Sequence, residues 1–139
     1  MKRMIFLLCA LGLLLLAACG DKKEVTVDYG SSERYTKEDM DAAVTAIRAE
    51  FDTWKGCELH ALRYGGDAQC TEENLRWLNE LGQAQQGEGG FTECMGFLSD
   101  FHSPKRDSGA WNADYEYTDW QWWLGRRPGG EWVLLTWGY

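Results

Sequence analysis

The sequence contains two segments in which a carboxylate and an imidazole stand two residues apart, Glu58-Leu59-His60 and Asp100-Phe101-His102. On a β-strand, residues two apart point to the same face. If these two strands paired, Glu58, His60, Asp100 and His102 could converge on a metal ion or a general base, as in a metal-assisted hydrolase. The alternative is that they are polar residues on a half-exposed sheet face. Because such pairs are common by chance, we expect no metal, no cofactor and no catalytic residue.

Tryptophan is the most distinctive residue type. The chain has eight, and six of them lie between Trp111 and Trp137. In the predicted strand 115–124 both alternating faces carry aromatic rings, and only one face can look into a helix-covered core. We therefore expect an open face that binds a glycan, a peptide or an envelope protein, since Trp and Tyr combine flat apolar area with a polar group. Its residues would be Tyr115, Tyr117, Asp119, Gln121 and Trp123. The alternative is that the rings fill the core.

The first 18 residues predict export from the cytoplasm. Lys2 and Arg3 precede an unbroken apolar run over residues 4–18. As a helix this run covers roughly 22 Å, less than the apolar core of a bilayer, which is about 30 Å thick. A basic start followed by a short apolar run is typical of a secretory signal peptide. We assign residues 1–18 to it, residues 19–24 to a short tether and residues 25–139 to one domain.

The end of this segment, Leu16-Ala17-Ala18-Cys19, resembles the lipobox of bacterial lipoproteins. The resemblance implies a diacylglyceryl group on the thiol of Cys19, cleavage before Cys19 and usually N-acylation. The alternative is an ordinary signal peptide that happens to end near a cysteine. Two or three acyl chains would anchor the product in the cell membrane, facing away from the cytoplasm. Gly20 replaces the Asp that holds some lipoproteins at the inner membrane, so a cell with two membranes could carry the protein on its outer membrane.

The rest of the chain resembles small uncharacterised lipoproteins of anaerobic Gram-positive gut bacteria. The similarity lies in the stretches Trp111-Asn112-Ala113-Asp114 and Thr118-Asp119-Trp120-Gln121-Trp122-Trp123. It implies no activity. The expected function is therefore a membrane-anchored, non-catalytic domain that binds a ligand or a partner. The alternatives are the hydrolase described above and a structural accessory subunit of an envelope complex.

The charge balance argues against nucleic acid as a partner. Lys and Arg number 14 against 22 Asp and Glu, for a formal charge of −8. Loss of the predicted signal peptide removes Lys2 and Arg3 and makes the chain still more acidic. Phosphate binding needs clustered Lys and Arg, and the acidic balance of this chain opposes it.

Three cysteines remain as candidates for a disulfide, because Cys9 leaves with the signal peptide and Cys19 takes the lipid. They are Cys57, Cys70 and Cys94. Outside the cytoplasm a disulfide is permitted. We favour Cys57–Cys70, and Cys57–Cys94 or three buried thiols are the alternatives. The sequence has no Cys-x-x-Cys motif of the kind found in redox and zinc sites.

The remaining patterns predict the elements that position these residues. Thr36 caps a helix, with Asp39 completing a capping box, and apolar residues then follow helical spacing as far as Trp54. Strands are expected at 57–64, 91–102, 115–124 and 131–139, and a short one at 25–27. In strand 91–102, Phe91, Met95, Phe97 and Phe101 should share one face. Thr71 caps a second, shorter helix that Gly82 weakens, and residues 83–90 form a loop.

Together these elements predict an α+β fold. A long helix packs on a curved antiparallel sheet of about four strands, with the shorter helix beside them. This order looks like the cystatin-like or NTF2-like arrangement, a likeness of fold that carries no function.

Overall fold

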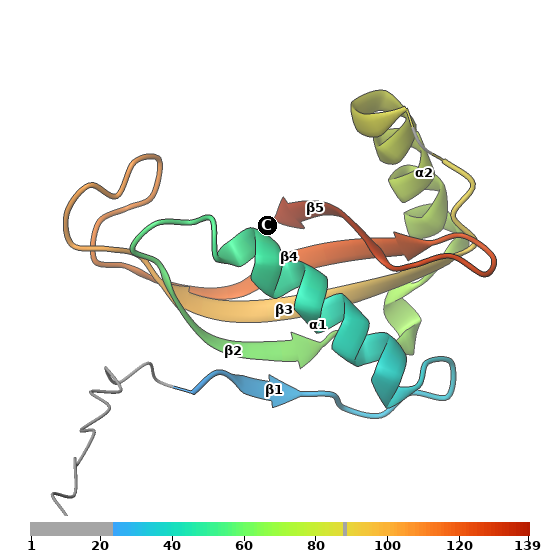
Figure 1. Ribbon diagram of the computed structural model, residues 1–139, viewed down its shortest axis with the longest axis horizontal. Coiled ribbons are helices and arrows are strands. Elements are labelled where there is room, and N and C mark those ends of the chain that lie inside the picture. The colour runs from blue at the N-terminus through green and yellow to red at the C-terminus, as the bar shows by residue number, and fades with distance from the viewer. Residues whose placement is uncertain (1–23, 88) are drawn as a thin grey trace, which may run out of the picture.

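The computed structural model describes residues 24–87 and 89–139. The predicted signal peptide, the lipobox cysteine Cys19 and the tether up to residue 23 lie outside the described residues. Five strands form a single sheet in the order β1-β2-β3-β4-β5. Their bounds are Thr26–Asp28, Glu58–Tyr64, Glu93–His102, Glu116–Arg126 and Val133–Gly138. Figure 1 shows the sheet with helix α1, Lys37–Phe51, lying across it and helix α2, Glu72–Gln86, at one end.

The α+β class is as predicted, but the expectation of about four antiparallel strands is wrong. Strands β2 to β5 form an antiparallel meander, and the short strand β1 adds to the free edge of β2 in parallel. The physical reason is the crossover: the chain passes over the sheet as α1 between β1 and β2, so it re-enters the sheet running the same way.

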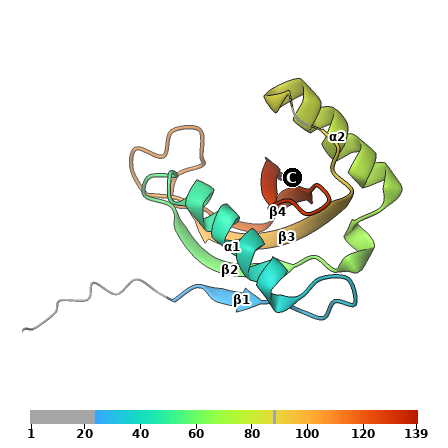
Figure 2. The ribbon, with the colours of Figure 1, turned by 45° about the vertical axis from the view of Figure 1, so that its right-hand side comes forward.

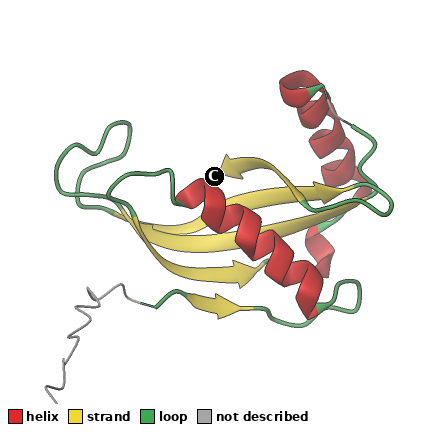
Figure 3. Cartoon of the chain, in the orientation of Figure 1, coloured by secondary structure: helices red, strands yellow, loops and turns green. Residues whose placement is uncertain are grey.

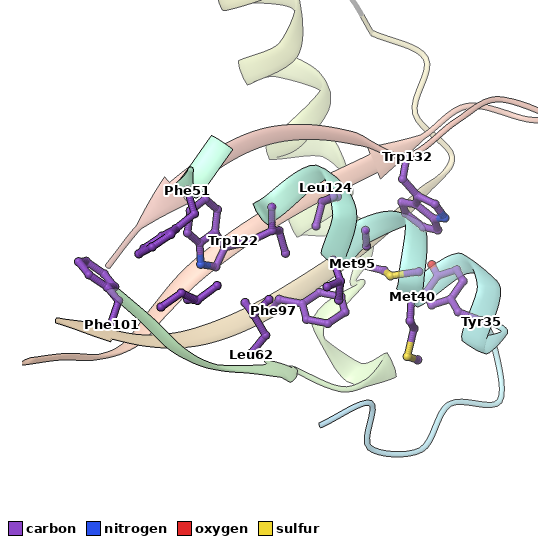
Figure 4. Packing of buried hydrophobic residues seen from close by; sticks show 14 of the residues in the cluster. Tyr35, Met40, Phe51, Leu62, Met95, Phe97, Phe101, Trp122, Leu124 and Trp132 are labelled. Atoms are coloured by element: carbon purple, nitrogen blue, oxygen red, sulfur yellow. The ribbon is translucent and has the colours of Figure 1, made fainter. Parts of the chain in front are cut away.

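Helix α1 begins where the sequence predicts. The hydroxyl of Thr36 accepts a hydrogen bond from the backbone N–H of Asp39, whose carboxylate accepts one from the N–H of Thr36. The helix ends at Phe51, earlier than the apolar spacing suggested, and Trp54 packs on the core from the turn that follows. The apolar side of α1 covers one face of the sheet, as Figure 4 shows for Met40 and Phe51. Its core partners on the sheet include Leu62, Met95, Phe97, Trp122 and Leu124. Each fully buried side chain of this size contributes about 1.5–3 kcal/mol.

Helix α2 covers part of the opposite face of the sheet. Its Leu78 packs with Cys94 and Trp123, which alternate along their strands with Met95 and Trp122 of the first core. The turned view in Figure 2 separates the two helices on the curved sheet. The helix runs past Gly82 to Gln86 and ends at Gly87, whose φ of 66° is left-handed. The expected loop at 83–90 is therefore partly wrong, because the residues after Gly82 are good helix formers and Gly87 supplies the cap. For the same reason the expectation of a shorter second helix is wrong, since α1 and α2 both have 15 residues.

The prediction that Phe91 lies on the same face of the sheet as Met95 and Phe97 is also wrong. The ring of Phe91 belongs to the core under α2, and the side-chain amide of Asn79 bonds both the N–H and the C=O of Phe91. A methyl group at Gly125 would lie 2.9 Å from the Phe91 ring, so the glycine makes room for it. Phe91 precedes β3, which begins at Glu93, and the alternation of the strand does not extend to it.

The disulfide joins Cys70 to Cys94, with their Cα atoms 5.3 Å apart. The predicted Cys57–Cys70 pair is therefore wrong. Cys70 comes just before α2 and Cys94 lies in β3 on the face that α2 covers, so the bond ties that helix to the sheet. Cys57 is free and half-buried, and burial raises the pKa of its thiol.

Candidate functional site

Two bulges shift the registers around Asp100, one in β2 and one in β4. Between β2 and β3, Leu59 pairs with Phe101 but Ala61 pairs with Asp100, which leaves His60 as the extra residue. Between β3 and β4, Phe101 pairs with Tyr117 but Ser99 pairs with Trp120. The second bulge contains Asp119, whose φ of 56° is left-handed. These bulges decide which side chains reach each face of the sheet.

On the face away from α1, a chain of imidazoles and carboxylates crosses three strands. The Nδ1 atoms of His60 and His102 each lie 2.9 Å from a different carboxylate oxygen of Glu116. The Nε2 atom of His102 lies 2.8 Å from Oδ1 of Asp114. The two imidazole rings lie 6.4 Å apart, centre to centre, and nearly parallel. We call these four residues the histidine cluster.

Both ring nitrogens of His102 face carboxylate oxygens. An ionised carboxylate only accepts hydrogen bonds, so His102 must carry both ring protons to donate to Asp114 and to Glu116. The hydrogen bond to Asp114 and then that to Glu116 raise the pKa of His102 above its usual value, and His102 in turn lowers the pKa of Asp114. The arrangement therefore favours an imidazolium held between two carboxylates.

The predicted convergence of Glu58, His60, Asp100 and His102 is only partly confirmed. Glu58 lies opposite His102 in the register, and its carboxylate is 3.4 Å from Nε2 of His60, a buried atom without a hydrogen-bond partner. Asp100 does not join them. Its carboxylate pairs with Arg63 at 2.7 and 3.0 Å and accepts the backbone N–H of Asp119. The guanidinium of Arg63 is the main cause that holds the pKa of Asp100 below its usual range.

Sequence reasoning missed Glu116 and Asp114, which hold the cluster together. Each is an ordinary acidic residue near the start of a strand, and only the register with β3 places them beside His102. Within residues 24–87 and 89–139, no group of three or more His, Cys, Asp or Glu side chains has the geometry to hold a metal ion.

The predicted open face of Tyr115, Tyr117, Asp119, Gln121 and Trp123 is wrong as a single surface. The Asp119 bulge turns Tyr117 toward α1, where it is buried and stacks on Phe101 at 4.8 Å. Trp123 lies on the opposite face and is buried in the α2 core, with its indole N–H donating to Gln121. Only Tyr115 and Asp119 are well exposed. The prediction assumed that side chains alternate between the two faces along the whole strand, and the bulge breaks this alternation.

A different set of aromatic residues is partly exposed at the end of the sheet where the histidine cluster lies. We call it the aromatic end. Its six members are Trp54, Trp111, Tyr115, Trp120, Trp137 and Tyr139. Their rings form a chain of contacts: Trp54 lies 5.0 Å from Trp111 and 6.3 Å from Trp137, and Trp120 lies 4.9 Å from Tyr139.

The outer rings of the aromatic end are open to solvent. Tyr139 is 75% exposed, Tyr115 50% and Trp137 38%. Trp54, Trp111 and Trp120 are half-buried. Trp54 stacks on the fully buried Trp122 at 5.1 Å, so the exposed rings rest on the core. Surface aromatic clusters supported in this way are typical of binding surfaces.

An open cleft of about 850 Å³ adjoins the aromatic end. Trp54 lines it together with Glu24, the first described residue, and with Cys57 and Glu58 at the start of β2. Charges of both signs surround it, including Arg48 and Lys55 against Glu24, Asp52 and Glu58. Exposed Lys105 and Arg106 lie in the connection between β3 and β4, at the same end of the sheet (Figure 3).

Comparison with known proteins gives no relative for this arrangement: no family model matches the chain, and neither the curated proteins nor the solved structures give a significant match. In the described part of the chain, neither helix is long and apolar enough to span a membrane. The aromatic end and the histidine cluster are therefore the features from which a function must be argued.

Proposed function

We propose that this chain is a lipoprotein, anchored through Cys19 in the cell membrane on the side away from the cytoplasm, with a non-catalytic domain that binds a ligand or partner. The aromatic end is its contact surface. The partner classes expected from the sequence were a glycan, a peptide or an envelope protein. For the fold we propose a cystatin-like or NTF2-like arrangement, since one long helix lies along a curved sheet.

The observation that carries this proposal is the exposure of the aromatic end. Trp137 and Tyr139 remain open to solvent although the chain has a core that buries Trp122 completely. Apolar rings left outside a well-filled core favour a second partner, because covering them would remove more apolar area from water.

The geometry of the histidine cluster favours binding over hydrolysis. A metal-assisted hydrolase needs imidazole lone pairs directed at a metal, whereas both ring nitrogens of His102 face carboxylates. Asp100 is occupied by Arg63. The acid–base groups at this end of the sheet are therefore arranged to hold strands and a loop together.

The anchor is tested by the intact mass of the protein from a bacterial membrane fraction. We expect a mass above that of the polypeptide 19–139 by the acyl groups, and Cys19→Ala should abolish both the excess and the membrane association. A chain with no added mass that still begins before Cys19 would overturn the anchor.

The contact surface is tested by oxidative footprinting of the full chain, read by mass spectrometry. Trp137 and Tyr139 should oxidise several-fold more slowly in the anchored protein within intact cells than in purified Cys19→Ala protein in buffer. Trp77 is the internal control, because it is 41% exposed against 38% for Trp137 and projects from α2 at the other end. Equal oxidation of Trp137 in both samples would show that the aromatic end contacts nothing.

A further inference from the structure

We propose that the partner of the aromatic end is the bilayer itself, whose headgroup region receives the exposed rings. This inference rests on the proposed lipid at Cys19. It goes further, because it commits the contact surface to a membrane interface and not to a glycan, a peptide or another protein.

The first argument is where the tether meets the domain. Glu24 lies in the cleft beside Trp54, so the chain enters the fold at the aromatic end. Five residue steps separate Glu24 from Cys19 in the sequence. Fully extended, they reach roughly 18 Å. Strand β4, with 11 residues, spans roughly 36 Å. The extended tether is thus shorter than the length of the sheet. It therefore keeps the end of the domain that contains Glu24 near any membrane in which Cys19 is anchored.

The second argument is the topology, which gathers the exposed rings at that end. The end of α1, the starts of β2 and β4, and the end of β3 all lie on the side where the chain enters (Figure 1). Strand β5 runs toward the same end and stops opposite Gln121, near the middle of β4. From there Trp137 contacts Trp54 and Tyr139 contacts Trp120. Trp77 and the α2 core lie at the opposite end. The exposed aromatic area is therefore concentrated where the tether would hold it against a bilayer.

The third argument is the chemistry of the rings. Trp and Tyr are the residues that membrane proteins concentrate at the headgroup level, since their apolar rings carry one polar group that stays hydrated. Tyr139 and Tyr115 are half or more exposed, so their rings and hydroxyls face solvent. Both can place an apolar ring at the interface with the hydroxyl in the headgroup layer.

The fourth argument is the pattern of charge. Lys55, Lys105 and Arg106 are exposed at this end and make no salt bridge within the described part of the chain, although the charge of Lys105 also acts on Asp114. The carboxylates of Asp114 and Glu116 are matched by imidazoles of the histidine cluster. These exposed cations can thus meet lipid phosphates, although the acidic residues of the cleft and the neighbouring Asp107 and Asp114 limit the attraction. We therefore expect contact with zwitterionic membranes as well, driven by the rings.

The experiment uses the full lipidated chain, reconstituted into phosphatidylcholine vesicles with and without brominated acyl chains, which quench nearby tryptophans. Four of the eight tryptophans belong to the aromatic end. Emission should therefore fall in brominated vesicles, by up to about half. The double variant Trp111→Phe, Trp137→Phe removes two of these four tryptophans and should lose about half of the quenched fraction. The matched control, Trp77→Phe, should keep it, and far-UV circular dichroism confirms that each variant is folded.

The outcomes separate this inference from the proposed function. Protein that floats with the vesicles but shows no quenching is anchored without contact, which overturns the bilayer as partner. Footprinting protection in cells without quenching in pure lipid also overturns it and indicates a glycan, peptide or protein. A loss of quenching in Trp77→Phe alone would show that the bilayer contacts α2 and not the aromatic end, which would also overturn the inference. Protein that carries no lipid and does not float would overturn both proposals.

Discussion

At the scale of single residues, His102 shows how geometry restricts a chemical state. Its two ring nitrogens lie 2.9 Å from Glu116 and 2.8 Å from Asp114, and neither carboxylate can donate when ionised. A neutral imidazole would leave one nitrogen facing an acceptor without a proton between them. Asp114 precedes β4 and its backbone N–H donates to the carbonyl of Pro104, so the imidazolium also fastens the connection between β3 and β4.

We predict that His102 stabilises the fold within a limited pH window. Its pKa is raised in the fold, so its contribution is complete below the unfolded value of about 6.5 and is lost as pH rises through the folded value. The pKa of Asp114 is lowered, so its contribution is complete above the unfolded value of about 3.9 and is lost as pH falls through the folded value. Urea unfolding of His102→Gln against the parent protein should show the largest destabilisation between these two values.

The control for this prediction is Asp114→Asn, which removes the strongest cause of the raised pKa of His102. The chain has two histidines, so their ring protons can be followed one by one in an NMR titration. The midpoint for His102 should lie above about 6.5 in the parent protein and fall in Asp114→Asn. An unchanged midpoint would contradict the role assigned to Asp114.

At the scale of elements, the sequence predicts what is local and misses what depends on register. Thr36 and Thr71 mark both helix starts correctly, because each caps a backbone N–H three residues ahead. The predicted orientation of Tyr117 was wrong, because the bulge at Asp119 interrupts the alternation of side chains between the two faces of β4. No residue near Asp119 in the sequence marks this bulge. The aromatic end could not be found from spacing, since Trp54 and Trp111 meet only after folding.

We predict that the left-handed backbone of Asp119 restricts what can replace it. Its φ of 56° is tolerated by Asp and Asn but costs other residues about 1–2 kcal/mol, with β-branched side chains affected most. Asp119→Val should therefore unfold at lower urea concentration than Asp119→Asn. Both variants lose the charge of the 2.6 Å ion pair with Arg63. Asn can still accept a hydrogen bond from Arg63, but this contact is exposed and contributes little, so the difference between the variants reports chiefly on the backbone. Equal midpoints would indicate that the bulge relaxes at little cost.

We predict that the Cys70–Cys94 disulfide stabilises the attachment of α2. It closes a loop with a sequence separation of 24, which corresponds to about 3–4 kcal/mol in the chain-entropy description. Thermal unfolding should occur at a lower temperature in reductant, or in the double variant Cys70→Ala, Cys94→Ala. Cys57→Ala is the control, because it leaves the disulfide in place and should respond to reductant as the parent does. A reductant effect lost in Cys57→Ala would show that Cys57 takes part in the pairing.

At the scale of the whole molecule, the two helices divide the sheet unequally. Helix α1 covers one face, while α2 covers the other only where Cys94 and Trp123 lie. The uncovered part of that second face carries the histidine cluster and the Arg63–Asp100 pair, which are polar groups that pair with one another except at Nε2 of His60. Apolar exposure is thereby concentrated at the aromatic end, where the predicted tether enters. A surface of this size binds weakly by itself, so the tether must supply a high local concentration.

We predict that a longer tether weakens the membrane contact without removing the anchor. Inserting 20 Gly/Ser residues after Gly20 lengthens the span between Cys19 and Glu24 from five residue steps to about 25. Because effective concentration falls roughly as the −3/2 power of linker length, the ratio of membrane-bound to free aromatic ends should drop about tenfold. Brominated-lipid quenching should decrease while flotation with the vesicles stays complete. Undiminished quenching would mean that the aromatic rings hold the bilayer by their own affinity, so that the short tether is not what positions the domain.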